Sequence, residues 1–184
     1  ATVRASQTAG LLKVGRLSGL PSQLFGSFAE QFYQKLAQEG EDQKYKTNTN
    51  PGLIGSAAQL ALALPNARFV FVTRDRDDLA LRIFMKKYKA GNEYSYDIGT
   101  VFEHIDWVDA MIALLTQKLG KRALHIRYED MVADPQQISE QVLDLCGLDK
   151  TDFSAAAVGS DVGASVPYKA MLKSALQDSH HAKT

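Results

Sequence analysis

The sequence predicts an α/β protein in which parallel strands are flanked by helices. Residues 67–73 and 123–128 are largely apolar runs, and each is too short for a helix. Helical patterns lie between these runs and after the second, so the chain reads strand, helix, helix, strand, helix. Parallel strands need long crossover connections of this kind, and their burial on both faces gives continuous apolar runs.

The composition fits one folded domain over residues 1–184. Hydrophobic residues make up 45% of the chain and charged residues 23%, which excludes a disordered chain and a disulfide-dense secreted scaffold. We expect a weakly structured lead-in over residues 1–20 and a tail over residues 173–184. Lys and Arg number 21, as do Asp and Glu, so the broad cationic field of a nucleic-acid-binding protein is missing. Any phosphate chemistry must therefore be local.

Two helical patterns precede the first strand. Apolar residues recur at steps of three and four from Pro21 to Gly40, which predicts an amphipathic helix that ends near Gly40. Residues 53–64 are rich in Ala and Leu and predict a second helix that ends before Pro65.

The segment between the strands predicts two more helices. Asp77 and Asp78 follow the first strand and lysines gather before Gly91, so acids at the start and bases at the end suit a helix dipole. A turn-rich stretch, residues 91–99, precedes a long helix over residues 100–119. The expected inward face of the long helix consists of Phe102, Ile105, Val108, Ile112 and Leu115.

A capped helix follows the second strand. Asp134 stands at its N-cap position, Pro135 in its first turn and Gly147 at its end. The single cysteine, Cys146, lies in an apolar run, and we expect it to be a small core residue. No run reaches the ~18 apolar residues of a membrane span, and residues 1–20 lack the apolar block of a signal peptide, which predicts a cytoplasmic protein.

The first strand ends in Arg74, directly before a helix start. The carboxyl ends of parallel strands face the crevice in which such sheets bind ligands. A guanidinium and helix N–H groups at this place suit a phosphate, which the guanidinium can hold bidentately. The alternative is that Arg74 pairs with Asp77 or Asp78 and only fixes the turn, and its position alone favours neither interpretation.

The second strand ends in Tyr128, Glu129 and Asp130, at the same expected edge of the sheet. In a binding site, the tyrosine ring could face an adenine and the two carboxylates could anchor loop amides. The alternative, which the residues alone favour, is a tyrosine that closes the core beside two solvated acids. No Cys/His or carboxylate spacing predicts a metal site.

The sequence motifs at the two strand ends together resemble those of the sulfotransferase family. The likeness is greatest to the bacterial branch that is often fused to tetratricopeptide repeats and is related to tyrosylprotein sulfotransferases. It covers residues 45–148, with a weaker likeness back to Pro21. The residues that carry it are Val72-Thr73-Arg74-Asp75, Asp78, Tyr88, Gly91, Tyr96-Asp97, Trp107, the block from Arg127-Tyr128-Glu129-Asp130 to Asp134-Pro135, and Cys146-Gly147-Leu148.

The resemblance implies a P-loop-like fold and the donor 3′-phosphoadenosine 5′-phosphosulfate, whose sulfuryl group passes to a hydroxyl or an amine. Arg74 matches the family's arginine for the 3′-phosphate, and Tyr128 matches the tyrosine near the adenine. Sulfuryl transfer is similar to phosphoryl transfer, in which positioning, neutralisation of anions and a base for the acceptor matter most.

The chain departs from the family pattern at three places. Arg82 stands where the family has a serine for the 3′-phosphate, so it either contacts that phosphate or is a solvated helix residue. Thr49 stands where related bacterial members carry a lysine that serves the transferring group. Residues 14–19 match the family's phosphosulfate loop only weakly. We therefore expect this loop, and the family's first strand, which precedes it, to be lacking or degenerate in this chain. The acceptor-activating base has no match.

Two functions are therefore open. The first is a sulfotransferase in which Arg74, Tyr128 and Arg82 bind the donor and the catalytic residues are unknown. The second is a degenerate, non-catalytic module that serves as a structural or interaction subunit of a larger assembly. The acceptor, a small molecule or a protein, is not identified by the sequence, and we expect no nucleic acid, membrane span or metal.

Overall fold

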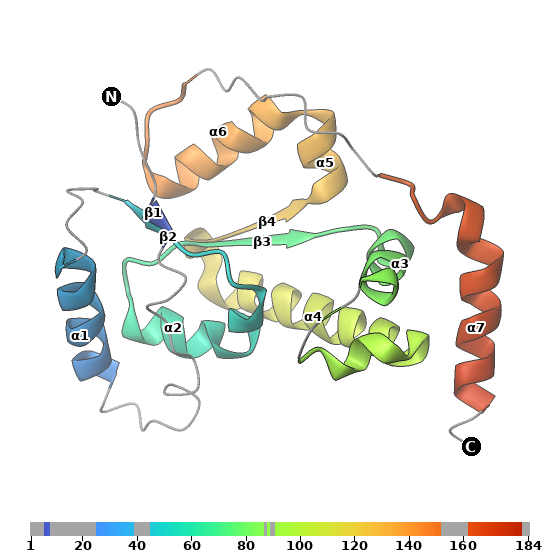
Figure 1. Cartoon of the computed structure of the whole chain (residues 1–184). Coiled ribbons are helices and arrows are strands. Elements are labelled where there is room, and N and C mark those ends of the chain that lie inside the picture. Colours follow the sequence, from blue (N-terminus) through green and yellow to red (C-terminus); the bar gives the residue numbers. More distant parts are fainter. Residues whose placement is uncertain are drawn as a thin grey trace. The chain divides into compact units, whose positions relative to one another are not determined.

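The structure is a computed structural model of the chain (Figure 1), and it describes residues 6–7, 25–38, 45–86, 88, 91–151 and 162–181. These residues belong to two compact units, residues 1–67 and residues 68–184, which are described separately. Residues 14–19, which match the phosphosulfate loop weakly, lie outside the described residues, as does most of the expected lead-in. The assignment of the chain to a single domain stays a prediction.

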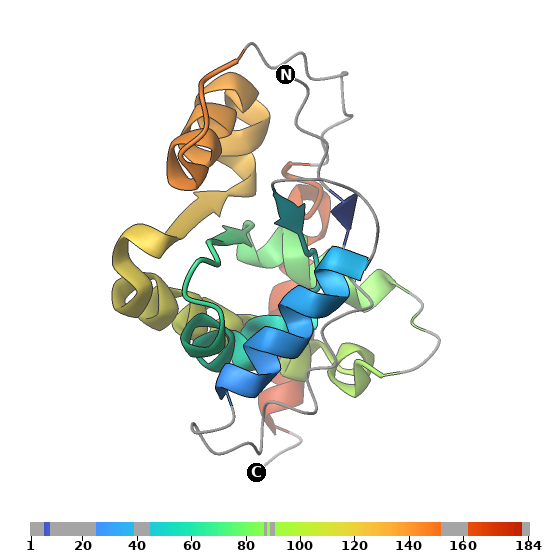
Figure 2. The ribbon, with the colours of Figure 1, turned by 90° about the vertical axis from the view of Figure 1, so that its left-hand side faces the viewer.

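The first unit is mainly helical. In it, α1 (Phe25–Gln38) contacts α2 (Ala57–Ala63), and Figure 2 shows the ribbon turned by 90°. A 3-10 helix, η3 (Pro51–Ser56), runs directly into α2, so the second expected helix begins with a tighter turn. Two short strands, β1 (Ser6–Gln7) and β2 (Lys46–Thr47), pair in parallel.

The second unit contains the predicted pair of parallel strands. β3 (Phe69–Thr73) pairs with β4 (Ala123–Arg127). In this register the first residue of β3 lies opposite the first residue of β4, and the last residue opposite the last. The strands therefore end level with each other. The sequence-predicted junctions, Arg74 and Tyr128, follow these ends directly, at one edge of the sheet.

The connection between β3 and β4 is the expected helical crossover. It consists of α3 (Arg76–Met85), η4 (Glu93–Tyr96), α4 (Ile98–Leu119) and η5 (Gly120–Arg122). Aspartates cap both α-helices, because the side chain that precedes each helix accepts the N–H three residues later, at 3.0 Å for α3 and 2.8 Å for α4.

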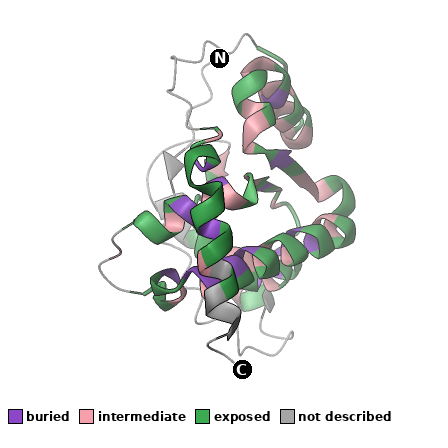
Figure 3. Ribbon diagram, turned by 90° about the vertical axis from the view of Figure 1, so that its right-hand side faces the viewer, coloured by how far each residue is buried: buried purple, intermediate pink, exposed green. Residues whose placement is uncertain are grey.

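A buried cluster lies where α3, α4 and α7 (Lys169–His181) meet. Figure 3 shows buried segments along α4 and next to α7. The cluster consists of Ala80, Leu81, Ile98, Val101, Phe102, Ile105 and Leu172. On the predicted inward face of α4, Phe102, Ile105, Ile112 and Leu115 are buried and Val108 is half-buried, so this prediction is confirmed.

Two helices follow β4, namely α5 (Tyr128–Ala133) and α6 (Pro135–Cys146). As predicted, the Asp134 side chain caps α6 by accepting a hydrogen bond from Gln137 N at 2.9 Å. Gly147 ends α6 with a φ of +65°, a conformation that glycine adopts without steric cost. Cys146 is half-buried, at the last position of this helix.

The described residues near the carboxyl terminus, 162–181, contain two helical elements. A short 3-10 helix, η6 (Val166–Tyr168), leads into α7, which continues to His181, although we expected a tail from residue 173. Leu172 joins the buried cluster and holds α7 to the unit. The α/β class with parallel strands is confirmed. In the part of the chain that the structure describes, no helix is both long and apolar enough to cross a membrane.

Candidate functional site

The candidate site lies where β3 and β4 end. Arg74 leaves β3 and Tyr128 opens α5, and the carbon at the centre of the Arg74 guanidinium lies 4.7 Å from the centroid of the Tyr128 ring. A guanidinium at this distance over a ring face makes a favourable cation–π contact. Two residues that are far apart in the sequence thus bring a cationic group and an aromatic ring into contact.

Arg74 also forms an ion pair within its own turn. Its Nη2 lies 3.7 Å from Oδ2 of Asp78, and only 11% of the Arg74 side chain is exposed. The structural interpretation of Arg74 predicted such a pair with Asp77 or Asp78, and the partner is Asp78. The distance exceeds the ~2.7–2.9 Å of a direct charge-assisted hydrogen bond. Asp78 therefore acts on this guanidinium through charge rather than through a short bond.

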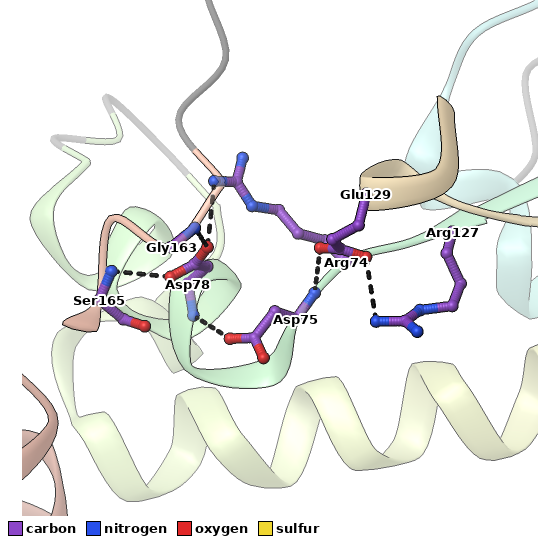
Figure 4. Close-up of polar contacts among 7 residues, drawn as sticks. All are labelled: Arg74, Asp75, Asp78, Arg127, Glu129, Gly163 and Ser165. Carbon is purple, nitrogen blue, oxygen red and sulfur yellow. Dashed lines mark hydrogen bonds and ion pairs between the residues drawn. The ribbon is translucent and has the colours of Figure 1, made fainter. Parts of the chain in front are cut away.

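Asp78 is a buried carboxylate with partners in a distant segment (Figure 4). It is 2% exposed, and it accepts hydrogen bonds from Ser165 N at 2.7 Å and from Gly163 N. Burial by itself would raise the pKa of Asp78. Hydrogen bonds from Ser165 and Gly163, together with the charge of Arg74, outweigh burial, so the pKa of Asp78 lies below its ordinary value. The carboxylate is therefore held in its ionised form.

Glu129 joins the two strand ends. Its Oε1 accepts a hydrogen bond from Asp75 N at 2.8 Å, and its Oε2 lies 3.4 Å from Nη2 of Arg127 (Figure 4). Of the two interpretations of these acids, Glu129 fits the one in which a carboxylate anchors a loop amide, and not the solvated acid that the residues alone favour. Asp130, the second candidate, is exposed. The bond to Asp75 fixes the backbone next to Arg74, which limits the positions that its guanidinium can reach.

Arg82 and Thr49 stand at positions where the chain departs from the family pattern. Arg82 is exposed and lies in the last turn of α3. It follows the first residue of that helix by six positions, which is a rise of about 9 Å along the helix axis. Thr49 is exposed and belongs to the first unit. The structure thus brings together two of the three predicted donor-binding residues, Arg74 and Tyr128, and leaves the role of Arg82 a prediction.

Sequence reasoning missed two contacts near the strand ends. It gave no partner for Asp78 outside its own turn, although Gly163 and Ser165 bind its carboxylate. It also missed the contact of 2.8 Å between Thr73 Oγ1 and His125 Nε2, which lie across the β3–β4 pair. Thr73 pairs with Arg127, two residues after His125, so the second contact is a diagonal one between the strands, and the strand pairing provides a signal for it. No local pattern links Asp78 to a segment 85 residues away.

A separate cavity of about 310 Å³ lies beside the buried cluster. Its lining residues are Arg76, Asp77, Phe102, Lys169, Leu172 and Lys173. Two bonds of 2.7 Å join Arg76 to Asp106, so an acid already balances the charge of this arginine. Among the described residues, no group of three or more His, Cys, Asp or Glu side chains could hold a metal ion.

Comparisons with known proteins agree with the resemblance of the strand ends. A family model described as "Sulfotransferase family" matches residues 20–152, a range that contains both strand ends. The chain belongs to the sulfotransferase family. Protein-tyrosine sulfotransferase 2 of Gallus gallus is 25% identical over 141 residues, which cover 73% of this sulfotransferase-family chain and 37% of the relative. The chain thus spans little more than a third of that relative's length.

A solved structure has a similar fold. The crystal structure of a sulfotransferase from Alicyclobacillus acidocaldarius matches with a TM-score of 0.50 and 15% identity. The match covers 83% of this chain and 71% of that one. At this level of identity the likeness concerns the fold alone, and it confirms the P-loop-like α/β class that we expected of a sulfotransferase-family member.

Proposed function

We propose that the edge formed by Arg74 and Tyr128 binds the nucleotide of 3′-phosphoadenosine 5′-phosphosulfate. Arg74 contacts the 3′-phosphate and Tyr128 lies against the adenine. The observation that supports this proposal is the guanidinium of Arg74 over the ring of Tyr128, at the level ends of two parallel strands. Ligands of parallel α/β sheets bind at such ends.

The chemistry of these groups fits a phosphate next to a base. A guanidinium presents a planar fork of donors that matches phosphate oxygens, and an aromatic face stacks on a purine. The nearby charge of Asp78 opposes an anion, but that carboxylate accepts two backbone N–H bonds, which stabilise its charge locally. Glu129 holds the Asp75 amide and so keeps Arg74 near the edge.

The proposed reaction is sulfuryl transfer to a hydroxyl or amine acceptor. The bond between the sulfuryl sulfur and the phosphate oxygen breaks as a bond from sulfur to the acceptor oxygen or nitrogen forms. 3′-Phosphoadenosine 5′-phosphate leaves, and the acceptor loses its proton to a base or to water. In this reaction, Arg74 and Tyr128 bind and orient the nucleotide, and Arg82 is a second candidate contact for the 3′-phosphate. Because the relative from Gallus gallus is named a protein-tyrosine sulfotransferase, a tyrosine hydroxyl is the first acceptor to test. A cytoplasmic location stays a prediction from the sequence.

A non-catalytic, sulfotransferase-like module is the second candidate function. Thr49 and Arg82 replace a lysine and a serine of the family pattern, and the Arg74–Asp78 ion pair is what a purely structural arginine would form. Such a module would serve as a structural or interaction subunit of a larger assembly. It would transfer no sulfuryl group, even where it binds the nucleotide.

Calorimetric titration with 3′-phosphoadenosine 5′-phosphate tests the proposed function. We expect the parent protein to bind, and we expect Arg74→Ala to weaken binding at least tenfold, since a charge-assisted contact contributes about 1.5–3 kcal/mol. Arg122→Ala is the matched control, because Arg122 lies over the ring of Phe69 at the opposite end of the sheet. Absence of binding by the parent at millimolar ligand would contradict the proposal.

Transfer of label from the sulfur-labelled donor to a tyrosine peptide separates the two candidate functions. The proposed function predicts labelled peptide that depends on the parent protein and decreases in Arg74→Ala. Tight nucleotide binding without transfer to any offered acceptor would favour the non-catalytic module instead.

A further inference from the structure

Asp78 joins three segments of the second unit. It belongs to the first turn of α3, its Oδ1 accepts from Ser165 N, and its Oδ2 accepts from Gly163 N and lies near Nη2 of Arg74. Within the described residues, it is the only charged residue in the buried class. A buried carboxylate is costly unless its partners satisfy it, so the contacts of Asp78 are a specific feature of this site.

The turn that Asp78 holds is itself well formed. Gly163 has a φ of +77°, and its carbonyl oxygen accepts a hydrogen bond from Val166 N at 3.0 Å. Ser165 is 1% exposed, and its carbonyl oxygen accepts from Tyr168 N at 2.8 Å. This C-terminal turn, defined as residues 163–168, leads directly into α7, whose Leu172 is buried in the cluster.

The position of the C-terminal turn determines which groups the Asp78 carboxylate binds. With the turn in place, the carboxylate binds two amides and stays 3.7 Å from the Arg74 guanidinium. If the turn leaves, these amides are lost, and the nearest cation for the carboxylate is Arg74. A closer pair would then compete with any phosphate for the guanidinium. Docking of the turn and binding of an anion at Arg74 should therefore favour each other.

We propose that Asp78 is a positioning residue that links docking of the C-terminal turn to nucleotide binding at Arg74. The inference rests on the proposed function, because it concerns the same nucleotide. It assigns to residues 163–168 a role in regulating affinity, and the contacts of Asp78 with Gly163, Ser165 and Arg74 support it. By reciprocity, nucleotide binding stabilises the docked turn as much as the docked turn strengthens nucleotide binding.

Asp78→Asn tests this linkage because it removes the charge that connects the turn to Arg74. The oxygen of the substituted side chain can accept a bond from one backbone N–H, but its NH₂ group opposes the other, so the turn should loosen. A neutral side chain does not compete with a phosphate for the guanidinium, so we expect binding of 3′-phosphoadenosine 5′-phosphate to be at least as tight as in the parent although the turn is loosened. Asp77→Asn, which removes the neighbouring charge, should bind like the parent.

Gly163→Ala provides a second variant that leaves Asp78 and Arg74 unchanged. A side chain is strained at the positive φ of this residue, although an added Cβ meets only Val166 Cγ2, at 3.7 Å. The docked turn should become less favourable, and nucleotide binding should weaken severalfold. This variant keeps the proposal testable if Asp78→Asn does not fold.

Hydrogen exchange of the Gly163 and Ser165 amides, followed by NMR, provides the decisive readout. We expect the nucleotide to slow exchange of both amides in the parent, and we expect this slowing to disappear in Asp78→Asn. Three results would overturn the linkage alone: unchanged exchange on nucleotide binding, a Gly163→Ala variant that binds as tightly as the parent, or an Asp78→Asn variant that binds tenfold more weakly than the parent. A parent protein that binds no nucleotide would instead refute the proposed function, and the linkage with it.

Discussion

The contact between Arg74 and Tyr128 leads to a prediction about the ring. We expect Tyr128→Phe to bind 3′-phosphoadenosine 5′-phosphate within about twofold of the parent, since the aromatic face remains. Tyr128→Ala removes that face and should weaken binding about fivefold or more, since base stacking contributes ~1–3 kcal/mol. Calorimetric titration of both variants measures the difference. Equal losses in the two variants would assign the role to the hydroxyl and contradict an adenine stacked on the ring.

Asp78 leads to a prediction about acid stability. Its pKa in the folded protein lies below the ordinary value of 3.8, so the folded state favours the ionised form. Its contribution to the free energy of unfolding is fully present above about pH 4 and is lost as the pH falls through the folded-state pKa. Thermal melts between about pH 6 and about pH 2 should therefore show a smaller acid-induced decrease in Asp78→Asn than in the parent. Identical decreases would contradict this assignment.

Single residues also show how far the sequence is informative. Arg74, Tyr128 and Glu129 follow recognisable strands, and parallel pairing alone places them at one edge. The partners of Asp78 lie 85 and 87 residues away, in a segment of small residues without periodicity. No local pattern specifies that contact, because it depends on how the C-terminal turn packs in three dimensions.

At the scale of elements, the capping pattern gives a quantitative prediction. Asp134 caps α6 through Gln137 N, and its replacement by Ala should lower the free energy of unfolding by about 1 kcal/mol. Asp144→Ala, at an exposed site in the last turn of the same helix, is the control and should change it by less than about 0.5 kcal/mol. Urea denaturation measures both, and equal effects would show that the cap contributes nothing specific.

The exposed pair between α3 and α4 should contribute less than its geometry suggests. Arg76 and Asp106 form two bonds of 2.7 Å, but both side chains are about half exposed. Solvent screening limits such pairs to about 1 kcal/mol or less, so Asp106→Asn should lower the free energy of unfolding by no more than that. Nucleotide binding should be unchanged. A loss of several kcal/mol in urea denaturation would contradict this interpretation of the pair.

The elements that the sequence predicted are those with strong local signals. Apolar runs identified β3 and β4, and caps or periodicity identified α3, α4 and α6. The extent of α7 was not predicted, because polar and charged residues make up much of its last part and Leu172 alone supplies a fully buried anchor among its described side chains. The 3-10 start at Pro51 was also missed, since the Ala- and Leu-rich pattern begins only after it.

At the scale of the whole molecule, the formal charge of zero agrees with a local anion site rather than a polyanion surface. Membership of the sulfotransferase family accounts for the arrangement of strand ends. The roles of Thr49 and Arg82, where the chain departs from the family pattern, stay predictions. The proposed site therefore depends on one contact, between Arg74 and the 3′-phosphate of the nucleotide.

The most direct test compares two nucleotides that differ only in the 3′-phosphate. Calorimetric titration of the parent and of Arg74→Ala with 3′-phosphoadenosine 5′-phosphate and with adenosine 5′-phosphate gives four affinities. We predict that Arg74→Ala weakens the first nucleotide at least tenfold and the second by less than about twofold, because only the first presents the phosphate that Arg74 contacts. Equal weakening of both nucleotides, or of neither, would contradict the claim that Arg74 binds the 3′-phosphate.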